Sequence, residues 1–112
     1  MEISERKVSD VCVVGISGRL DSATSESLGQ RLHELIDRGE RRLVIDAEKL
    51  DYISSTGLRV LLVAAKNLKT INGRIVLSSL KPHILEVFEI AGFKSIFPIY
   101  ATADQAAQQS SE

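Results

Sequence analysis

The segment RLVIDAEKLDYISSTGLRVLL, residues 42–62, joins a strand pattern to a helix pattern and decides the fold. Residues 42–47 are apolar and β-branched at their centre, which predicts a strand. From Thr56 to about Ile71, apolar residues recur at helical spacing, which predicts a helix with one buried face. That face comprises Leu58, Leu61, Leu62, Ala65, Leu68 and Ile71. A strand followed directly by a helix is the repeating unit of α/β domains.

Two further strands precede this segment. Residues 2–8 predict a short strand, and residues 11–17, VCVVGIS, predict a Val-rich second one. The tight turn between them favours an antiparallel hairpin. Gly18 predicts the end of the second strand.

The first helix lies between the hairpin and residue 42. Asp21 and Ser22 both offer an N-cap, because a short side-chain oxygen can accept from free backbone N–H groups. Gly39 is placed to end the helix. Its buried face comprises Leu28, Leu32, Leu35 and Ile36.

A third strand-and-helix unit follows the decisive segment. Asn72 and Gly73 end the preceding helix, and residues 74–79 predict a strand. Pro82 suits the first turn of the next helix, and Gly92 ends it. The predicted buried stripe of that helix comprises Ile84, Leu85, Phe88 and Ala91.

The C-terminal part predicts a short strand and a final helix. The strand falls within residues 95–100 and is weakened by Pro98. Thr102 and Gln105 have the spacing of a capping box and open the helix. Residues 108–112 are expected to fray.

The resulting order is β-β-α-β-α-β-α-β-α. Strands that alternate with helices imply a mostly parallel sheet with crossover helices. We therefore expect a single α/β domain over residues 1–112, with its core at about 3–108. Its sheet is mixed, because of the N-terminal hairpin, and about four helices flank it.

Composition restricts the classes of function. The chain has 112 residues, 14 basic and 15 acidic, with a net charge of -1 and no Trp. A near-neutral chain with few aromatic residues does not suit a nucleic-acid partner. No segment approaches the about 18 to 20 apolar residues of a membrane span. The N-terminus has no apolar stretch of signal-peptide type, so we expect a cytoplasmic protein without a membrane partner.

The sequence offers little for catalysis or metal binding. It lacks a phosphate-binding glycine loop and a nucleophile elbow. His33 and His83 lie among charged residues of helices, so we expect both on the surface. Cys12 sits within an apolar strand and is expected to be buried. We expect no catalytic residue, no metal site and no cofactor.

Three carboxylates could gather at the strand ends. Asp21, Asp46 and Asp51 each fall near the end of a predicted strand. Such residues more often cap helices and shape turns than form an acid–base pair.

Ser54, Ser55 and Thr56 form a run of three hydroxyls ahead of Gly57. Ser54 or Ser55 is expected to cap the helix, and Gly57 to allow close packing against the preceding strand. One hydroxyl suffices for a cap. A hydroxyl at this edge of an α/β sheet is exposed, and free N–H groups at a helix start can accept a phosphate. The segment therefore suits a phosphorylation switch better than it suits catalysis.

These residues resemble a known family. LVIDAEKLDYISSTGLRVLL, with GRLD upstream and GRIVLSSLKPHILEVFEIAGFKSIFPIYATADQA downstream, is similar to the STAS-domain anti-sigma factor antagonists of bacteria. The resemblance covers about residues 3 to 108 and keeps the order and spacing of the family's motifs. The family fold is a mixed sheet flanked by helices.

The resemblance implies a partner-switching protein, not an enzyme. In that family, the unphosphorylated antagonist binds an anti-sigma factor that is also a serine kinase of the GHKL type, and the sigma factor is released. The kinase then phosphorylates one serine of the antagonist and ends the interaction. A PP2C-type phosphatase reverses the modification. Separately from the resemblance, the predicted core faces of the helices and strands account for the apolar residues, so we expect a monomer.

The resemblance also assigns residues. The family loop reads aspartate, phosphorylated serine, serine or threonine, glycine, leucine, which places the phosphorylated serine on Ser55. Thr56 and Gly57 match the next two positions. Ser54 stands where the family has aspartate, so Ser54 and Thr56 are weaker candidates for the phosphate.

The implied partner surface has two parts. The family turn of glycine-x-leucine-aspartate matches residues 18–21, so Asp21 is a candidate partner contact. The second part is the start of the helix, with Ser54, Thr56, Gly57 and Arg59. Arg59 is expected to be exposed, as a partner contact, a phosphate ligand or ordinary surface.

Two other hypotheses about the function remain. STAS domains also regulate secretion, biofilm and stress-complex pathways, or serve as components of lipid transport. A small enzyme or nucleotide-binding protein that uses residues 54–56 would need a base or a phosphate loop. Neighbouring genes would distinguish these other STAS-domain roles from an anti-sigma factor antagonist. Tight nucleotide binding measured by calorimetry would support the enzyme or nucleotide-binding hypothesis.

Overall fold

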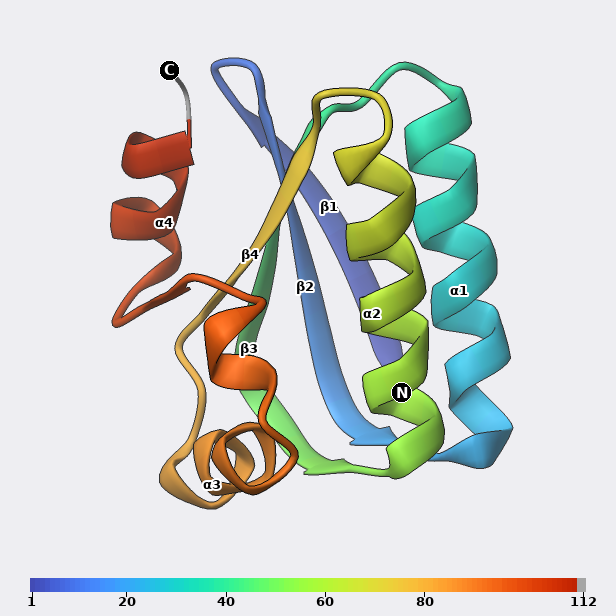
Figure 1. Cartoon of the computed structure of the whole chain (residues 1–112), viewed down its shortest axis with the longest axis vertical. Coiled ribbons are helices and arrows are strands. Elements are labelled where there is room, and N and C mark those ends of the chain that lie inside the picture. The colour runs from blue at the N-terminus through green and yellow to red at the C-terminus, as the bar shows by residue number, and fades with distance from the viewer. Residues whose placement is uncertain (111–112) are drawn as a thin grey trace.

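The computed structural model describes residues 1–110 and shows a single five-stranded sheet flanked by four α-helices (Figure 1). The predicted order of elements is confirmed. In chain order they are β1 (Glu2–Val8), β2 (Val11–Leu20), α1 (Ser22–Asp37), β3 (Arg42–Ile53), α2 (Ser55–Lys69), β4 (Arg74–Ser78), α3 (Pro82–Ile90), the 3-10 turn η1 (Phe93–Ser95), β5 (Ile99–Tyr100) and α4 (Ala103–Ser110).

The strands lie side by side in the order β1-β2-β3-β4-β5. β1 pairs with β2 in antiparallel fashion, and every other pair is parallel. Ser9 takes a φ of 56° in the turn between β1 and β2, which is the left-handed conformation that tight turns need. The mixed sheet with an N-terminal hairpin is therefore confirmed. No helix within residues 1–110 is long and apolar enough to cross a bilayer.

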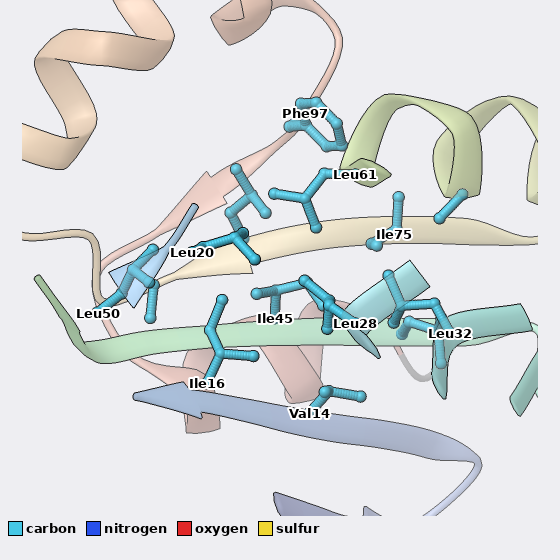
Figure 2. Packing of buried hydrophobic residues seen from close by; sticks show 14 of the residues in the cluster. Val14, Ile16, Leu20, Leu28, Leu32, Ile45, Leu50, Leu61, Ile75 and Phe97 are labelled. Atoms are coloured by element: carbon cyan, nitrogen blue, oxygen red, sulfur yellow. The ribbon is translucent and has the colours of Figure 1, made fainter. Parts of the chain in front are cut away.

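Alternate residues of the central strands enter two separate cores. Val14 and Ile16 of β2 join the larger core, which the sheet forms with α1, α2 and α3 (Figure 2). Val11 and Val13 of the same strand join a smaller core beneath α4. Successive side chains of a strand point to opposite faces, so one Val-rich strand serves both cores. α1 and α2 cover one face of the sheet, and α4 lies on the other (Figure 1).

β2 and β3 extend further than predicted. Gly18 does not end β2, because the strand continues to Leu20. Gly18 has a φ of 92°, and the pairing of β2 with β3 shifts just after it, so this glycine forms an irregularity inside the strand. β3 likewise continues past residue 47 to Ile53. Both strands therefore reach the helices that follow them without a loop.

Two predicted core residues lie outside their helices. α2 ends at Lys69, and Ile71 is 38% exposed. Ala91 is the C-cap of α3 and is exposed. Each occupies the correct helical phase, but the helix ends before its side chain can face the sheet. In α2, Ala64 is buried although the predicted stripe omitted it.

β5 is shorter than predicted, and α4 extends further than predicted. β5 contains two residues, and the Pro98 carbonyl just before it accepts from the Leu77 N–H at 2.9 Å. Thr102 caps α4 through the Gln105 N–H at 3.1 Å. Residues 108–110 were expected to fray, and this prediction is wrong, because α4 continues to Ser110, which is 1% exposed. Residues 111 and 112 lie outside the described part of the chain.

Candidate functional site

Two strand-to-helix junctions meet at one edge of the sheet. Leu20 ends β2, Ile53 ends β3, and the two residues are paired in the parallel register. The Ser54 N–H donates to the Leu20 carbonyl oxygen at 2.9 Å, one step beyond the last pair. α1 and α2 therefore begin next to each other, at the edge where α/β domains commonly place their functional residues.

Ser54 is the N-cap of α2. Its backbone is extended, with φ -94° and ψ 171°. Its Oγ accepts from the Gly57 N–H at 3.1 Å, and its carbonyl accepts from the Leu58 N–H at 3.0 Å. The Ser54 hydroxyl is therefore engaged in starting the helix.

Ser55 and Thr56 occupy the first two positions of α2, and both are exposed. Within residues 1–110, neither hydroxyl has a hydrogen-bond partner in the protein. The three adjacent hydroxyls are therefore not equivalent. Ser54 shapes the helix, whereas Ser55 and Thr56 face outward beside backbone N–H groups that have no partner within the helix.

Gly57 allows α2 to approach the strand ends. A Cβ at this position would lie 2.8 Å from Leu20 Cγ and 3.1 Å from Ile53 Cγ1. Both distances are shorter than ordinary contacts between carbon atoms. The predicted close packing at Gly57 is confirmed, and Leu20 of the neighbouring strand is its nearest contact.

Asp21 caps α1 at the adjacent junction. Its Oδ1 accepts from the Ala23 N–H at 3.0 Å and the Thr24 N–H at 3.1 Å. The Thr24 hydroxyl in turn accepts from the Asp21 N–H and donates to the Arg19 carbonyl. The Thr24 N–H is the largest cause of the lowered pKa of the Asp21 carboxyl, because hydrogen bonds to the carboxylate favour its charged form. Asp21 therefore fixes the start of α1 as an anion.

An exposed arginine–tyrosine pair lies beside the same strand ends. The guanidinium of Arg19 sits 4.2 Å from the centre of the Tyr52 ring, and the two residues are register partners. Arg19 Nε is also 3.9 Å from Asp21 Oδ2. The sequence did not reveal this pair, because the register of β2 against β3 shifts twice before these residues meet.

A third junction, between β4 and α3, is tied to the end of β3. Lys81, the N-cap of α3, pairs with the Asp51 carboxylate, and His83 Nε2 lies 2.7 Å from the Asp51 carbonyl oxygen. The bond from Lys81 lowers the pKa of the Asp51 carboxyl. Sequence patterns within single elements could not have paired residues 30 positions apart.

The predicted ionisable candidates do not form a catalytic group with the hydroxyls. His33 pairs with Asp37 at 3.2 Å on the exposed side of α1, and His83 is exposed. Asp46 Oδ1 accepts from the Glu48 N–H within β3. Asp21 therefore caps a helix, Asp46 accepts a hydrogen bond within its own strand, and Asp51 forms a surface ion pair.

Arg59 lies four residues beyond Ser55 on α2 and is exposed, as predicted. Within residues 1–110, its guanidinium forms no hydrogen bond or ion pair with another residue. Residues four apart are neighbours on a helix surface. The structure therefore places a cation without a partner one turn from the Ser55 hydroxyl.

Comparison with known proteins gives the family. The sequence model of the STAS domain family matches residues 2–106 of this chain. A protein of Bordetella bronchiseptica named "Putative anti-sigma factor antagonist BtrV" is 46% identical over 107 residues, which are 96% of this chain and 92% of that protein. An anti-sigma factor antagonist from Mycobacterium paratuberculosis has a similar structure, with a TM-score of 0.91 at 23% identity over 99% of this chain and 94% of that chain. The phosphorylated form of Bacillus SpoIIAA gives a TM-score of 0.77 at 21% identity over 96% of this chain and 98% of that chain. The chain belongs to the STAS domain family.

Proposed function

We propose that this protein is an anti-sigma factor antagonist that phosphorylation at Ser55 switches off. In its unphosphorylated form it binds an anti-sigma factor with serine kinase activity of the GHKL type, and the bound sigma factor is released. The names of its relatives support this role. In this role the protein acts by binding its partner and not by catalysis.

The observation that carries the proposal is the different engagement of the three hydroxyls. Ser54 Oγ is held by the Gly57 N–H, whereas Ser55 is exposed at the first position of α2. A kinase must bring the acceptor oxygen to the γ-phosphate of ATP, so an exposed hydroxyl without a partner is the better acceptor. Thr56 shares that exposure, and the family resemblance favours Ser55.

A phosphate on Ser55 fits the surrounding charges. It would carry about -1.5 to -2 charges at the positive end of the α2 dipole. The Arg59 side chain is close enough in helical spacing to pair with it. The fold therefore tolerates the modification, and the new charge acts on the partner that docks there.

The proposed partner surface consists of the two adjoining helix starts. Thr56 and Arg59 contribute exposed side chains, whereas Asp21, Ser54 and Gly57 hold the two junctions in position. The surface is rigid, because its backbone belongs to strand ends and helix caps. We therefore expect little backbone change on binding.

The test is phosphorylation by the kinase encoded in the same genome. Incubation with ATP should add one phosphate, about 80 Da by intact mass, and a PP2C-type phosphatase should remove it. Ser55→Ala should abolish the addition, while Ser54→Ala and Thr56→Ala should retain it. Full modification of Ser55→Ala at another hydroxyl would show that the assigned acceptor is wrong.

A further inference from the structure

A groove runs between α1 and α2 on the side away from the sheet. It has a volume of about 230 Å³, and its walls include Ile36 from α1 and Val60 and Val63 from α2. Val63 is 50% exposed, although it is a large apolar residue. Arg59 lines the groove at its end near Ser55. Figure 1 shows α1 and α2 side by side.

Gly29 opens the middle of this groove. It lies inside α1, where glycine is among the least favourable residues. A Cβ at Gly29 would lie 3.6 and 3.8 Å from the two methyl groups of Val60, which are ordinary contacts. Its φ is not positive. Neither the backbone nor the packing of the fold therefore requires glycine here, and the effect of its missing side chain is to leave the groove deeper.

α2 carries positive charge on and beside the groove, because Arg59 lines it and Lys66 lies one turn beyond Val63. α2 contains no acidic residue, and its Arg59, Lys66 and Lys69 are all exposed. None of the three forms an ion pair within residues 1–110. Cations without an ion-pair partner beside the exposed Val63 suit a ligand that brings both apolar and acidic side chains.

We propose that the α1–α2 groove receives an apolar side chain from an acidic segment of the anti-sigma factor, with its carboxylates toward Arg59 and Lys66. This inference rests on the proposed function and extends its binding surface from the helix starts along α2. The groove begins one turn beyond Ser55, so the phosphorylated residue lies at its edge. A phosphate there would repel the same carboxylates that the groove attracts.

Two other occupants fit the observations less well. An anionic bilayer presents a flat surface, which does not fit the shape of a groove between two helices. A second copy of the chain would have to insert an exposed apolar residue with an acidic neighbour into the groove. Ile90 of α3, beside Glu89, is such a residue. That contact would join two different surfaces, which leads to rings or open filaments.

The test compares matched variants of the full chain against the purified kinase that phosphorylates Ser55. Val63→Asp should weaken binding about tenfold or more, since it places a charge in a desolvated contact. Ile90→Asp is the control, because Ile90 is 79% exposed on α3 and lies outside the groove. Its affinity should match that of the wild type.

Two further pairs of variants test the shape and the charge of the groove. Gly29→Leu should fill the groove and weaken binding, and Gly29→Ala should bind more tightly than Gly29→Leu. The melting temperature of Gly29→Ala should stay level or rise, because its Cβ meets only ordinary contacts, and a thermal melt of Gly29→Leu checks that this variant is folded. Lys66→Glu should slow association at low salt. Lys49→Glu, on an exposed strand position outside the groove, should not.

Each outcome decides one claim. If the kinase phosphorylates Ser55 but binds the Val63 and Gly29→Leu variants as it binds the wild type, the groove proposal fails and the proposed function stands. If no kinase or anti-sigma factor binds the wild type, both fail. The other two occupants are tested with the same variant. If the wild type self-associates in sedimentation and Val63→Asp does not, the groove binds a second copy and the proposal is overturned. If the wild type binds vesicles of phosphatidylserine and phosphatidylcholine and Val63→Asp does not, the groove binds lipid and the proposal is overturned.

Discussion

The Ser54 amide donates a 2.9 Å hydrogen bond to the Leu20 carbonyl and so ties the start of α2 to the end of β2. The bond continues the parallel pairing of Leu20 with Ile53 by one step. Ser54 is therefore fixed to the sheet, and the candidate phosphorylation segment is not a free loop. A change at one junction is expected to disturb the other.

Ser54 and Ser55 should differ in their effect on stability. Ser54→Ala removes an N-cap bond and should lower the free energy of unfolding by about 1 kcal/mol. Ser55→Ala removes a hydroxyl without a partner and should change it by less than about 0.5 kcal/mol. Urea denaturation measures both, and Ser54→Asp, which can also cap, should restore most of the loss. Equal losses for the two alanine variants would contradict the assignment of the cap.

Gly57 and Gly29 form a second matched pair. Gly57→Ala forces a Cβ to within 2.8 Å of Leu20 Cγ and should destabilise the fold by about 1 to 3 kcal/mol through overpacking. Gly29→Ala meets only ordinary contacts and should stabilise it by up to about 1 kcal/mol through helix propensity. Thermal and urea unfolding would decide. A neutral Gly57→Ala would mean that α2 can move away from Leu20.

Asp21 should make stability depend on pH in the acid range. Backbone and side-chain hydrogen bonds lower the pKa of its carboxyl in the folded state from the ordinary 3.8. Between the lowered folded pKa and 3.8, the unfolded chain binds more protons, so stability rises with pH. The contribution is fully present above 3.8 and is lost as the pH falls through the folded pKa.

Asp21→Asn isolates this effect, because asparagine can still cap the helix without titrating. The difference in unfolding free energy between the wild type and this variant should shrink as the pH falls below about 4. Glu5 and Asp51 also have lowered pKa values, and they contribute equally to both proteins. Parallel curves down to pH 2 would show that Asp21 does not behave as described.

Cys12 should be protected from thiol reagents in the folded protein. It is 1% exposed, and burial is the first cause of the raised pKa of its thiol. The thiolate is the reactive form, so Ellman's reagent should react slowly with native protein and rapidly in denaturant. Because Cys12 is the one cysteine of the chain, the assay has a single signal. A fast reaction under native conditions would mean that β2 opens locally.

Periodicity in the sequence predicted the helices and strands. It could not predict how far pairing with a neighbouring strand extends β2 and β3. The helical spacing of Leu58, Leu61 and Leu68 places them in the core of the fold, as expected. Gly18 has the local signal of a strand end, yet its pairing with Leu50 across the sheet keeps it in β2. Such pairing depends on residues far away in the sequence and leaves no local pattern.

The candidate site was likewise predictable where it depends on residues close together in the sequence, and not where it depends on residues far apart. Capping chemistry identified Asp21 and indicated Ser54 or Ser55, because caps depend on residues within one turn. It could not decide between the two serines, since the choice depends on where the backbone of α2 becomes helical. The stack of Arg19 on Tyr52 and the pairing of Lys81 with Asp51 arise only when three strands end at one edge.

The most direct measurement of the central claim is a displacement assay with the anti-sigma factor and its sigma factor. Unphosphorylated protein should bind the anti-sigma factor and release the sigma factor. The same protein, phosphorylated stoichiometrically at Ser55, should bind about tenfold or more weakly and release none. Equal binding and release by the two forms would contradict a switch at Ser55.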